Sequence, residues 1–296
     1  MTIPKIASYP MPTQAPENRV QWTLEAQRAV VLVHDMQDYF LDFYDRLAAP
    51  IPTLLANTSE LLARARAQQV PVVYTAQLPE QSQADRALLN DMWGPGLTAH
   101  PQRKDIAALL QPQPGDVVLD KWRYSAFQRS DLRETMRQWG RDQLVICGVY
   151  AHIGCMLTAA EAFMADVQPF FVVDALADFS EQEHAMAARY VSQRCGVSLL
   201  TQDALKALRT ALPQSVEDLR RTIAQQLQIP AQEISLQDSL LDWGLDSIRI
   251  MALLETWRAA GCELSFMQLA QDPTLQAWWA LLQGHATVQK QAEEVV

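Results

Sequence analysis

Short apolar runs alternate with amphipathic stretches over the first two thirds of the chain. The runs predict six β-strands: Ala29–His34, Pro71–Ala76, Val117–Leu119, Leu144–Val149, Pro169–Val173 and Val197–Leu200. Helical spacing of apolar residues predicts intervening helices, including 51–68, 130–139, 155–166 and 181–194. Four runs are close to continuously apolar, which is typical of strands buried on both faces. The pattern therefore predicts an α/β domain over 1–208 with a doubly wound, mostly parallel sheet.

A second pattern follows near Ser215. It predicts two helices over 215–227 and 247–260 with a loop between them, and a further helix after Pro273. The prediction is a small all-α helix bundle over 215–286.

The regions flanking the bundle are polar. The connection is expected within Ala204–Ser215, with the linker itself at 209–214. Residues 284–296 are polar enough to be disordered, and the tail proper is placed at 287–296.

Composition and charge exclude several classes. The 296 residues are 49% hydrophobic, which suits two globular domains. Since 24 basic residues oppose 34 acidic ones, the net charge is −10, and with no basic stripe a nucleic-acid partner is not expected. Residues 212–296 hold five basic and eleven acidic residues, so the bundle is expected to dock on basic patches of partner enzymes. No uncharged run is long enough to span a membrane.

Cysteine and histidine spacing gives no metal motif. Without a signal peptide, the four cysteines are expected to be free thiols in a reducing cytoplasm: Cys147, Cys155, Cys195 and Cys262. His34, His152 and His184 fit no common zinc spacing, and no catalytic metal is expected.

The run DWGLDSI places Ser247 after Gly244 and Asp246, at the expected start of a helix. The ordinary alternative is a helix N-cap made by Asp246 or Ser247. With the surrounding bundle, however, the run resembles the attachment site of acyl, peptidyl and aryl carrier proteins. That resemblance implies 4′-phosphopantetheine on Ser247, added by a phosphopantetheinyl transferase. Ile248, Met251 and Phe266 are expected near the arm as docking residues, with burial in the bundle as the alternative.

Polar groups follow three predicted strands. Asp35 follows the first, Lys121 the third, and the turn Gly148–Cys155 the fourth. Ligands of doubly wound sheets bind beyond the carboxyl ends of the strands. The order and spacing resemble the isochorismatase-like hydrolase superfamily, most of whose members use an Asp–Lys–Cys triad. Aligned on this turn, the position of the nucleophile falls on Gly154.

A glycine at this position resembles the isochorismatase branch, which hydrolyses a vinyl ether. Further matches to this branch are Gln77, Arg86, Trp93–Gly96, Tyr150–His152 and Ala175–Ser180. With the second segment included, the whole chain resembles the bifunctional isochorismatase and aryl carrier proteins of catecholate siderophore biosynthesis. Isochorismate and water would then give 2,3-dihydro-2,3-dihydroxybenzoate and pyruvate.

The implied chemistry needs a positioned acid and anchors for two carboxylates. Asp35 is the candidate acid, with an N-cap of the following helix as the alternative. Lys121 is expected to hold a substrate carboxylate or hydroxyl and to tune Asp35, with a solvated lysine at a strand end as the alternative. Gln77 and Arg86 are expected to bind a carboxylate, with an exposed helical salt bridge as the alternative for Arg86. The pyruvyl carboxylate is assigned to Tyr150 and to backbone N–H groups near Gly154. Phe40 and Trp93 are expected to wall the ring, or else to belong to the core.

Two other functions stay open. One is a cysteine amidohydrolase using Cys155, although one helical residue turns its side chain about 100° away from Gly154. The other is a carrier scaffold with an inactive first domain. For the bifunctional reading the expected partners are an aryl-acid adenylating ligase and a condensation domain of a nonribosomal peptide synthetase. The expected aryl acid is 2,3-dihydroxybenzoate, and superfamily members commonly form homo-oligomers.

Overall fold

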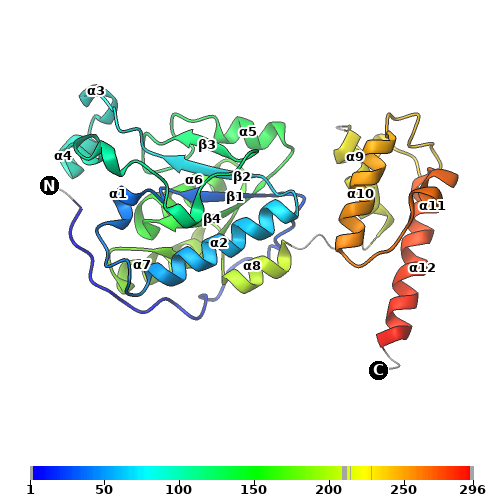
Figure 1. Cartoon of the computed structure of the whole chain (residues 1–296), viewed down its shortest axis with the longest axis horizontal. Helices are drawn as coiled ribbons and strands as arrows, with labels where there is room; N and C mark the ends of the chain where they lie inside the picture. Colours follow the sequence, from blue (N-terminus) through cyan, green and yellow to red (C-terminus); the bar gives the residue numbers. More distant parts are fainter. Residues whose placement is uncertain (1–2, 209–211, 214, 228, 294–296) are drawn as a thin grey trace. The chain divides into compact units, whose positions relative to one another are not determined.

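The computed structural model describes residues 3–208, 212–213, 215–227 and 229–293, in two compact units that meet in sequence between Leu208 and Arg209 (Figure 1). Most of the expected linker 209–214 lies outside the described residues. The wider stretch Ala204–Ser215 was placed too early, because its first four residues belong to a helix. No helix in the described part of the chain is long and apolar enough to cross a bilayer.

A six-stranded sheet forms the centre of the first unit. Its strands are β1 (Ala29–His34), β2 (Val72–Ala76), β3 (Val117–Asp120), β4 (Gln143–Val149), β5 (Gln168–Ala177) and β6 (Val197–Leu199). They lie in the order β3-β2-β1-β4-β5-β6, and every neighbouring pair is parallel. The predicted doubly wound sheet is confirmed. The strand order reverses between β1 and β4, and the carboxyl ends of these two strands flank the point where such sheets bind ligands.

Helices cover both faces of this sheet (Figure 1). Those on one face are α2 (Ile51–Ala67) and α8 (Thr201–Ala207), and those on the other are α5 (Leu132–Gln138), α6 (Met156–Met164) and α7 (Glu181–Arg194). Successive strand side chains point to opposite faces, so Val31 and Val33 pack in the first layer while Val30 and Leu32 pack in the second.

Strand β5 is four residues longer at its end than predicted. Asp174 interrupts the apolar run, which made the strand appear to stop at Val173. In the fold the Asp174 carboxylate accepts hydrogen bonds from the backbone N–H and the hydroxyl of Thr201, each at 2.7 Å. Because this polar side chain is paired with the start of α8, the strand continues to Ala177 beside the end of β4.

Short elements that the periodicity did not predict lie in the loops around the ends of the strands. They are α1 (Asp38–Leu41), α3 (Gln83–Arg86), α4 (Leu89–Trp93), the 3₁₀ turns η1 (Gly96–Ala99), η2 (Pro101–Arg103) and η3 (Ala108–Leu110), and the π-helical turn η4 (Ala151–Cys155). Elements of three to five residues are too short to show a helical repeat.

The second unit is a helix bundle with its own core. It contains α9 (Val216–Leu227), the turn η5 (Ala231–Glu233), α10 (Ser247–Ala259), α11 (Phe266–Gln271) and α12 (Leu275–Glu293). Trp257 of α10 and Trp278 of α12 are fully buried and meet edge to face at 6.0 Å between ring centroids. The expected disordered tail is corrected, since α12 continues to Glu293 through residues that favour helix, with neither proline nor glycine after Gly284. Residues 294–296 lie outside the described part.

Candidate active site and carrier serine

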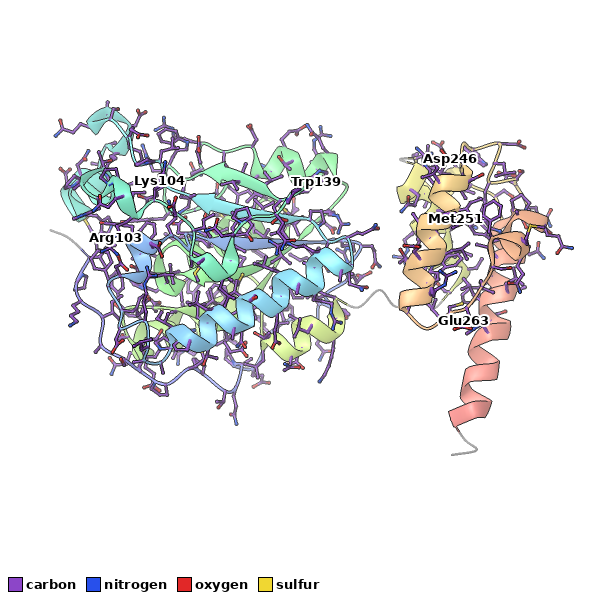
Figure 2. All side chains as sticks on the ribbon, viewed as in Figure 1. Arg103, Lys104, Trp139, Asp246, Met251 and Glu263 are labelled. Carbon is purple, nitrogen blue, oxygen red and sulfur yellow. The ribbon has the colours of Figure 1, made fainter. Side chains whose placement is uncertain are left out.

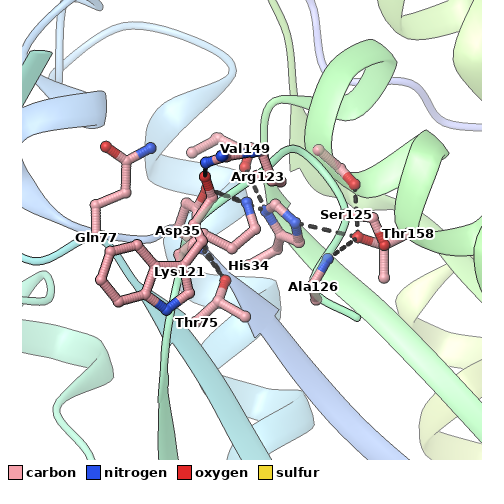
Figure 3. Close-up of polar contacts among 12 residues, drawn as sticks. His34, Asp35, Thr75, Gln77, Lys121, Arg123, Ser125, Ala126, Val149 and Thr158 are labelled. Atoms are coloured by element: carbon pink, nitrogen blue, oxygen red, sulfur yellow. Dashed lines mark hydrogen bonds and ion pairs between the residues drawn. The ribbon is translucent and has the colours of Figure 1, made fainter. Parts of the chain in front are cut away.

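Asp35 lies directly after β1 and is held by two donors. Its backbone is left-handed at φ 51°, a conformation that aspartate tolerates better than most residues. Lys121, which follows β3, donates to one carboxylate oxygen at 2.9 Å, and the Thr75 hydroxyl donates to the other at 2.7 Å (Figure 3). All three side chains are buried. The predicted Asp–Lys pair is therefore assembled from the ends of β1, β2 and β3.

His34 packs behind this pair and is neutral. Its Nδ1–H donates to the carbonyl of Val149 at 2.9 Å, and Nδ1 lies 3.6 Å from Asp35 Oδ2 (Figure 3). Complete burial, and next the positive charge of Lys121, lower the pKa of His34 to about 4. Because the ring is uncharged near neutral pH, Lys121 is the cation that pairs with Asp35.

One pocket contains every side chain that was predicted to act on the substrate. Its lining includes Asp35, Phe40, Gln77, Arg86, Trp93, Lys121, Tyr150 and Gly154. These residues come from five separate segments of the chain. Their placement in one pocket is a result of the fold; their individual roles stay predictions.

Arg86 enters the pocket as a buried cation and not as the exposed salt bridge that was the alternative. Its side chain donates to Gln81 Oε1 at 3.2 Å and to the carbonyl of Gly94 at 2.8 Å. Within the described residues its Nε has no hydrogen-bond partner, and burial lowers the pKa of the guanidinium. Gly96 makes this position possible, because a Cβ there would stand 2.6 Å from the Arg86 guanidinium. A buried cation with an unused donor is a suitable anchor for a carboxylate.

Aromatic rings form one side of the pocket. Tyr150 meets Phe179 at 4.7 Å between centroids, and the Trp93 indole N–H donates to the hydroxyl of Tyr124 at 2.8 Å. The Tyr150 hydroxyl donates to the carbonyl of Phe40 at 2.7 Å. Its single proton is thus already engaged, so Tyr150 contributes its ring to the pocket and the expected carboxylate contact of its hydroxyl needs revision.

Sequence reasoning missed several lining residues. They are Ile3, Tyr39, Leu89, Gly96, Arg123, Tyr124, Val149, Ile153 and Phe179. Arg123 and Tyr124 follow Lys121 closely in sequence, and Phe179 lies in the segment ALADFS that matched the family. Their closeness in sequence to predicted site residues could have indicated that they line the pocket. Ile3 had none, because it reaches the pocket only through the packing of the N-terminal segment.

The turn after β4 places Gly154 in the pocket and Cys155 outside its lining. The Cys155 side chain is buried in the layer of α5, α6 and α7, and burial raises its pKa well above the usual range. A buried, protonated thiol is a poor nucleophile. Backbone N–H groups of this turn were expected to be free to bind the pyruvyl carboxylate. Those of His152, Ile153 and Cys155 already donate to acceptors in the protein, so fewer are free than predicted. The peptide between Val149 and Tyr150 is cis.

His152, Asp178 and Glu183 form a small cluster beside the pocket. Their potential ligand atoms lie within 4.8 Å of one another. However, both oxygens of Asp178 already accept hydrogen bonds, from the ring and the backbone N–H of His152 and from the N–H of Phe179. The prediction that catalysis needs no metal stays a prediction.

Ser247 opens α10 in the second unit and is exposed. Asp246 is the N-cap, because its carboxylate accepts from the N–H of Arg249 at 2.9 Å, so the capping alternative for Ser247 does not apply. Gly244 allows the preceding turn with a φ of 90° and open space around it. Asp246 and Met251 both lie on the outside of the bundle (Figure 2).

The three predicted docking residues differ in exposure. Ile248 is 80% exposed and Met251 48% exposed, so burial in the bundle is excluded for both. Phe266 is half-buried and packs against the core of the bundle.

A parallel doubly wound sheet with a carboxylate–ammonium pair at its switch point, followed by a bundle that presents a serine, defines an isochorismatase-like hydrolase joined to a carrier-type domain. Comparisons with known proteins agree. The chain matches the isochorismatase domain over residues 29–203 and the phosphopantetheine attachment site over 217–282. It therefore belongs to the isochorismatase family, and its second unit is a phosphopantetheine-binding domain. The predicted family and fold class are confirmed.

Several relatives match almost the whole chain, and two of them represent the group. Enterobactin synthase component B of Escherichia coli (strain K12) is 48% identical over 284 residues, which cover 95% of this chain and 98% of that protein. The isochorismatase of Bacillus subtilis (strain 168) is 47% identical over 299 residues, with 95% and 96% covered. A cysteine hydrolase structure from Pseudomonas syringae pv. phaseolicola 1448A shares the fold, with a TM-score of 0.59, 23% identity, and 65% of this chain and 97% of that one covered.

Proposed function

We propose that the first unit hydrolyses the enolpyruvyl ether of isochorismate to 2,3-dihydro-2,3-dihydroxybenzoate and pyruvate. The observation that carries this proposal is the Asp35–Lys121 pair, with 2.9 Å between nitrogen and oxygen, in a pocket where a glycine stands at the position of the family thiol. Two relatives that share almost the whole chain are named for this activity or for enterobactin synthesis.

In its protonated form, Asp35 transfers a proton to the terminal methylene carbon of the ether. The resulting oxocarbenium ion is captured by water, and the water proton returns to Asp35. The hemiketal then collapses to pyruvate and the alcohol, so the acid is regenerated without a covalent enzyme intermediate. Lys121 stabilises the carboxylate form of Asp35 between the two proton transfers.

The substrate carries two carboxylates, and cations line the pocket to receive them. Arg86 and Arg123 both lie in the lining, and Lys121 contributes a further positive charge. Gln77 adds an amide donor. Phe40, Trp93 and the ring of Tyr150 supply the apolar wall against which the ring of the substrate packs.

The second unit carries an activated aryl acid, with 2,3-dihydroxybenzoate as the proposed group, as a thioester on phosphopantetheine at Ser247. Its proposed partners are a phosphopantetheinyl transferase, an aryl-acid adenylating ligase and a condensation domain of a nonribosomal peptide synthetase. We place the protein in the cytoplasm, where coenzyme A and these enzymes operate, and propose that it forms a homo-oligomer. The products of the two units then serve one siderophore pathway.

Two measurements on the full chain test these activities together. Pyruvate release from isochorismate tests the first unit, and intact mass after incubation with coenzyme A and a phosphopantetheinyl transferase tests the second. An inactive first unit in a chain that still accepts pantetheine would support the alternative of a carrier scaffold.

Replacing Cys155 by Ala should leave pyruvate release largely intact. The proposed chemistry has no thiolate step, and the thiol is buried with a raised pKa. The measurement is kcat and KM for pyruvate release, with the buried Cys195→Ala as the matched control for packing loss. A folded Cys155→Ala variant without activity would favour the amidohydrolase-type alternative.

Cleavage near Pro213 should give two folded fragments with separate activities. Each unit has its own hydrophobic core, so neither depends on the other for burial of apolar surface. A protease site inserted there allows pyruvate release and pantetheine loading to be measured before and after cutting. An insoluble or inactive first fragment would show that the proposed division, with its linker at 209–214, is wrong.

Met251→Ala should slow aryl transfer to the downstream synthetase more than it lowers the melting temperature. The side chain is exposed, so little packing is lost, while an apolar contact near the arm disappears. Leu241→Ala, which is also half-exposed in the same unit, serves as the comparison. Equal transfer rates for wild type and Met251→Ala would remove this residue from the docking surface; Phe266→Ala, being half-buried, is expected to affect both measurements.

A further inference from the structure

The imidazole of His34 stands where a side chain at position 154 would be. A Cβ built on Gly154 would lie 2.2 Å from His34 Cε1, 2.9 Å from Nε2 and 3.0 Å from Nδ1. Non-bonded carbon atoms keep about 3.5 Å or more between them, so even a methyl group is excluded. The two residues are 120 positions apart in sequence but fill a single volume beneath the pocket.

The ring of His34 is anchored by a hydrogen bond, and on its other side it packs against Thr158. On one side Nδ1–H donates to the carbonyl of Val149, and on the other Nε2 lies 3.3 Å from the Thr158 hydroxyl (Figure 3). Thr158 is itself fixed, because its hydroxyl donates to the carbonyl of Gly154 at 2.7 Å and accepts from the N–H of Ala126 at 2.9 Å.

The backbone of His34 also lies very close to a glycine, Gly148. Gly148 has a φ of 117°, and a Cβ there would meet the His34 carbonyl oxygen at 2.2 Å. Gly148, the penultimate residue of β4, and Gly154, in the turn that follows, therefore leave room for one residue of β1: Gly148 for its backbone and Gly154 for its ring. A side chain at either position would push β1 and the turn apart.

We propose that His34 is a positioning residue and a steric block: from β1 it fills the space of a side chain at position 154 and holds the turn after β4 through the Val149 carbonyl. This pairing keeps the pocket floor beside Asp35 free of any nucleophilic side chain, so water is the nucleophile that the site accepts. Residues 34 and 154 thus determine the type of reaction as a pair, and a thiol introduced at 154 is accommodated only when His34 is replaced by a smaller residue.

A double-mutant cycle tests the shared volume. Gly154→Ala should lower the melting temperature of the first unit strongly in the wild-type background and much less in His34→Ala, because the smaller residue leaves room for the methyl group. Equal losses in the two backgrounds would overturn the proposal. The result of this stability measurement does not depend on the proposed function.

A thiol probe gives a second, independent readout. Gly154→Cys combined with His34→Ala should fold and present a thiol in the pocket that iodoacetamide alkylates in the native state. The natural cysteines, all buried, should react slowly. Peptide mass spectrometry identifies the modified position. If Gly154→Cys with His34 intact is equally stable and equally reactive, the steric block does not exist.

The positioning role is tested by kinetics and rests on the proposed function. His34→Asn keeps a side-chain N–H for the Val149 carbonyl, whereas His34→Leu fills space without a donor. At similar melting temperatures, the Asn variant should retain more of kcat for pyruvate release than the Leu variant. Equal kcat values would overturn the hydrogen-bonding part of the proposal. Loss of all pyruvate release in the wild type would instead contradict the proposed function and leave the stability cycle to decide the packing.

Discussion

Asp35→Asn is expected to lower kcat for pyruvate release by about two to four orders of magnitude, the usual range for loss of a general acid. The amide has the shape of the carboxyl group and still accepts a hydrogen bond from Lys121 or Thr75, so the pocket should persist. What it lacks is a transferable proton for the methylene carbon of the ether. The measurement is steady-state release of pyruvate from isochorismate.

The specificity of this effect needs two controls. Asp142→Asn removes a carboxylate that pairs with Arg28 at the opposite end of the strands, and it should leave kcat unchanged. Pantetheine loading of Asp35→Asn should equal that of the wild type, because Ser247, the proposed attachment site, lies in the other unit. Turnover of Asp35→Asn within about threefold of wild type would refute Asp35 as the acid, since general-acid loss costs far more.

Ser247→Ala is expected to abolish pantetheine attachment and all aryl loading while pyruvate release stays unchanged. The hydroxyl is the only group of this residue that can form the phosphodiester, and the structure leaves it outside the helix cap, which Asp246 provides. The variant should therefore fold normally. Intact mass after incubation with coenzyme A and a transferase measures the modification, and radiolabelled aryl acid measures loading.

A second serine of the same unit provides the matched control for this variant. Ser265 caps α11 and shares its capping box with Gln268, so Ser265→Ala should cost some stability, about 1 kcal/mol, yet still accept pantetheine. A wild-type chain without an adduct, in the presence of a transferase that modifies another carrier protein, would remove the carrier proposal.

Much of the fold could be predicted because its core elements carry periodic patterns. Strand β1 is apolar at every position but the last, and β4 is nearly so, which is the pattern of a parallel strand covered on both faces. Strand β5 was cut short because Asp174 is polar, and only the tertiary contact with Thr201 explains how it is tolerated. The short elements from α3 to η3 were not predicted, since three to five residues are too few to show a helical repeat.

The part of the candidate site that lies directly after strands could be predicted, because the carboxyl ends of parallel strands meet at one edge of the sheet. Asp35 and Lys121 follow strands, and topology alone brings them to one edge of the sheet. Arg86 was found through the family resemblance, because nothing in the local sequence indicates that its guanidinium is buried. The contact between His34 and Gly154 was missed, since a close approach of two side-chain positions in different segments leaves no periodic trace.

The position of β1 at the middle of the sheet has a consequence for synthesis of the protein. Its second neighbour, β4, begins at Gln143, about 110 residues after β1 ends, so a nascent chain leaves one edge of this apolar strand unpaired for roughly 5–20 s at ordinary translation rates. Until then the ribosome-bound chain exposes the unpaired backbone edge of an apolar strand. Once residue 208 has emerged, the hydrolase can close on itself while the carrier serine is still being made.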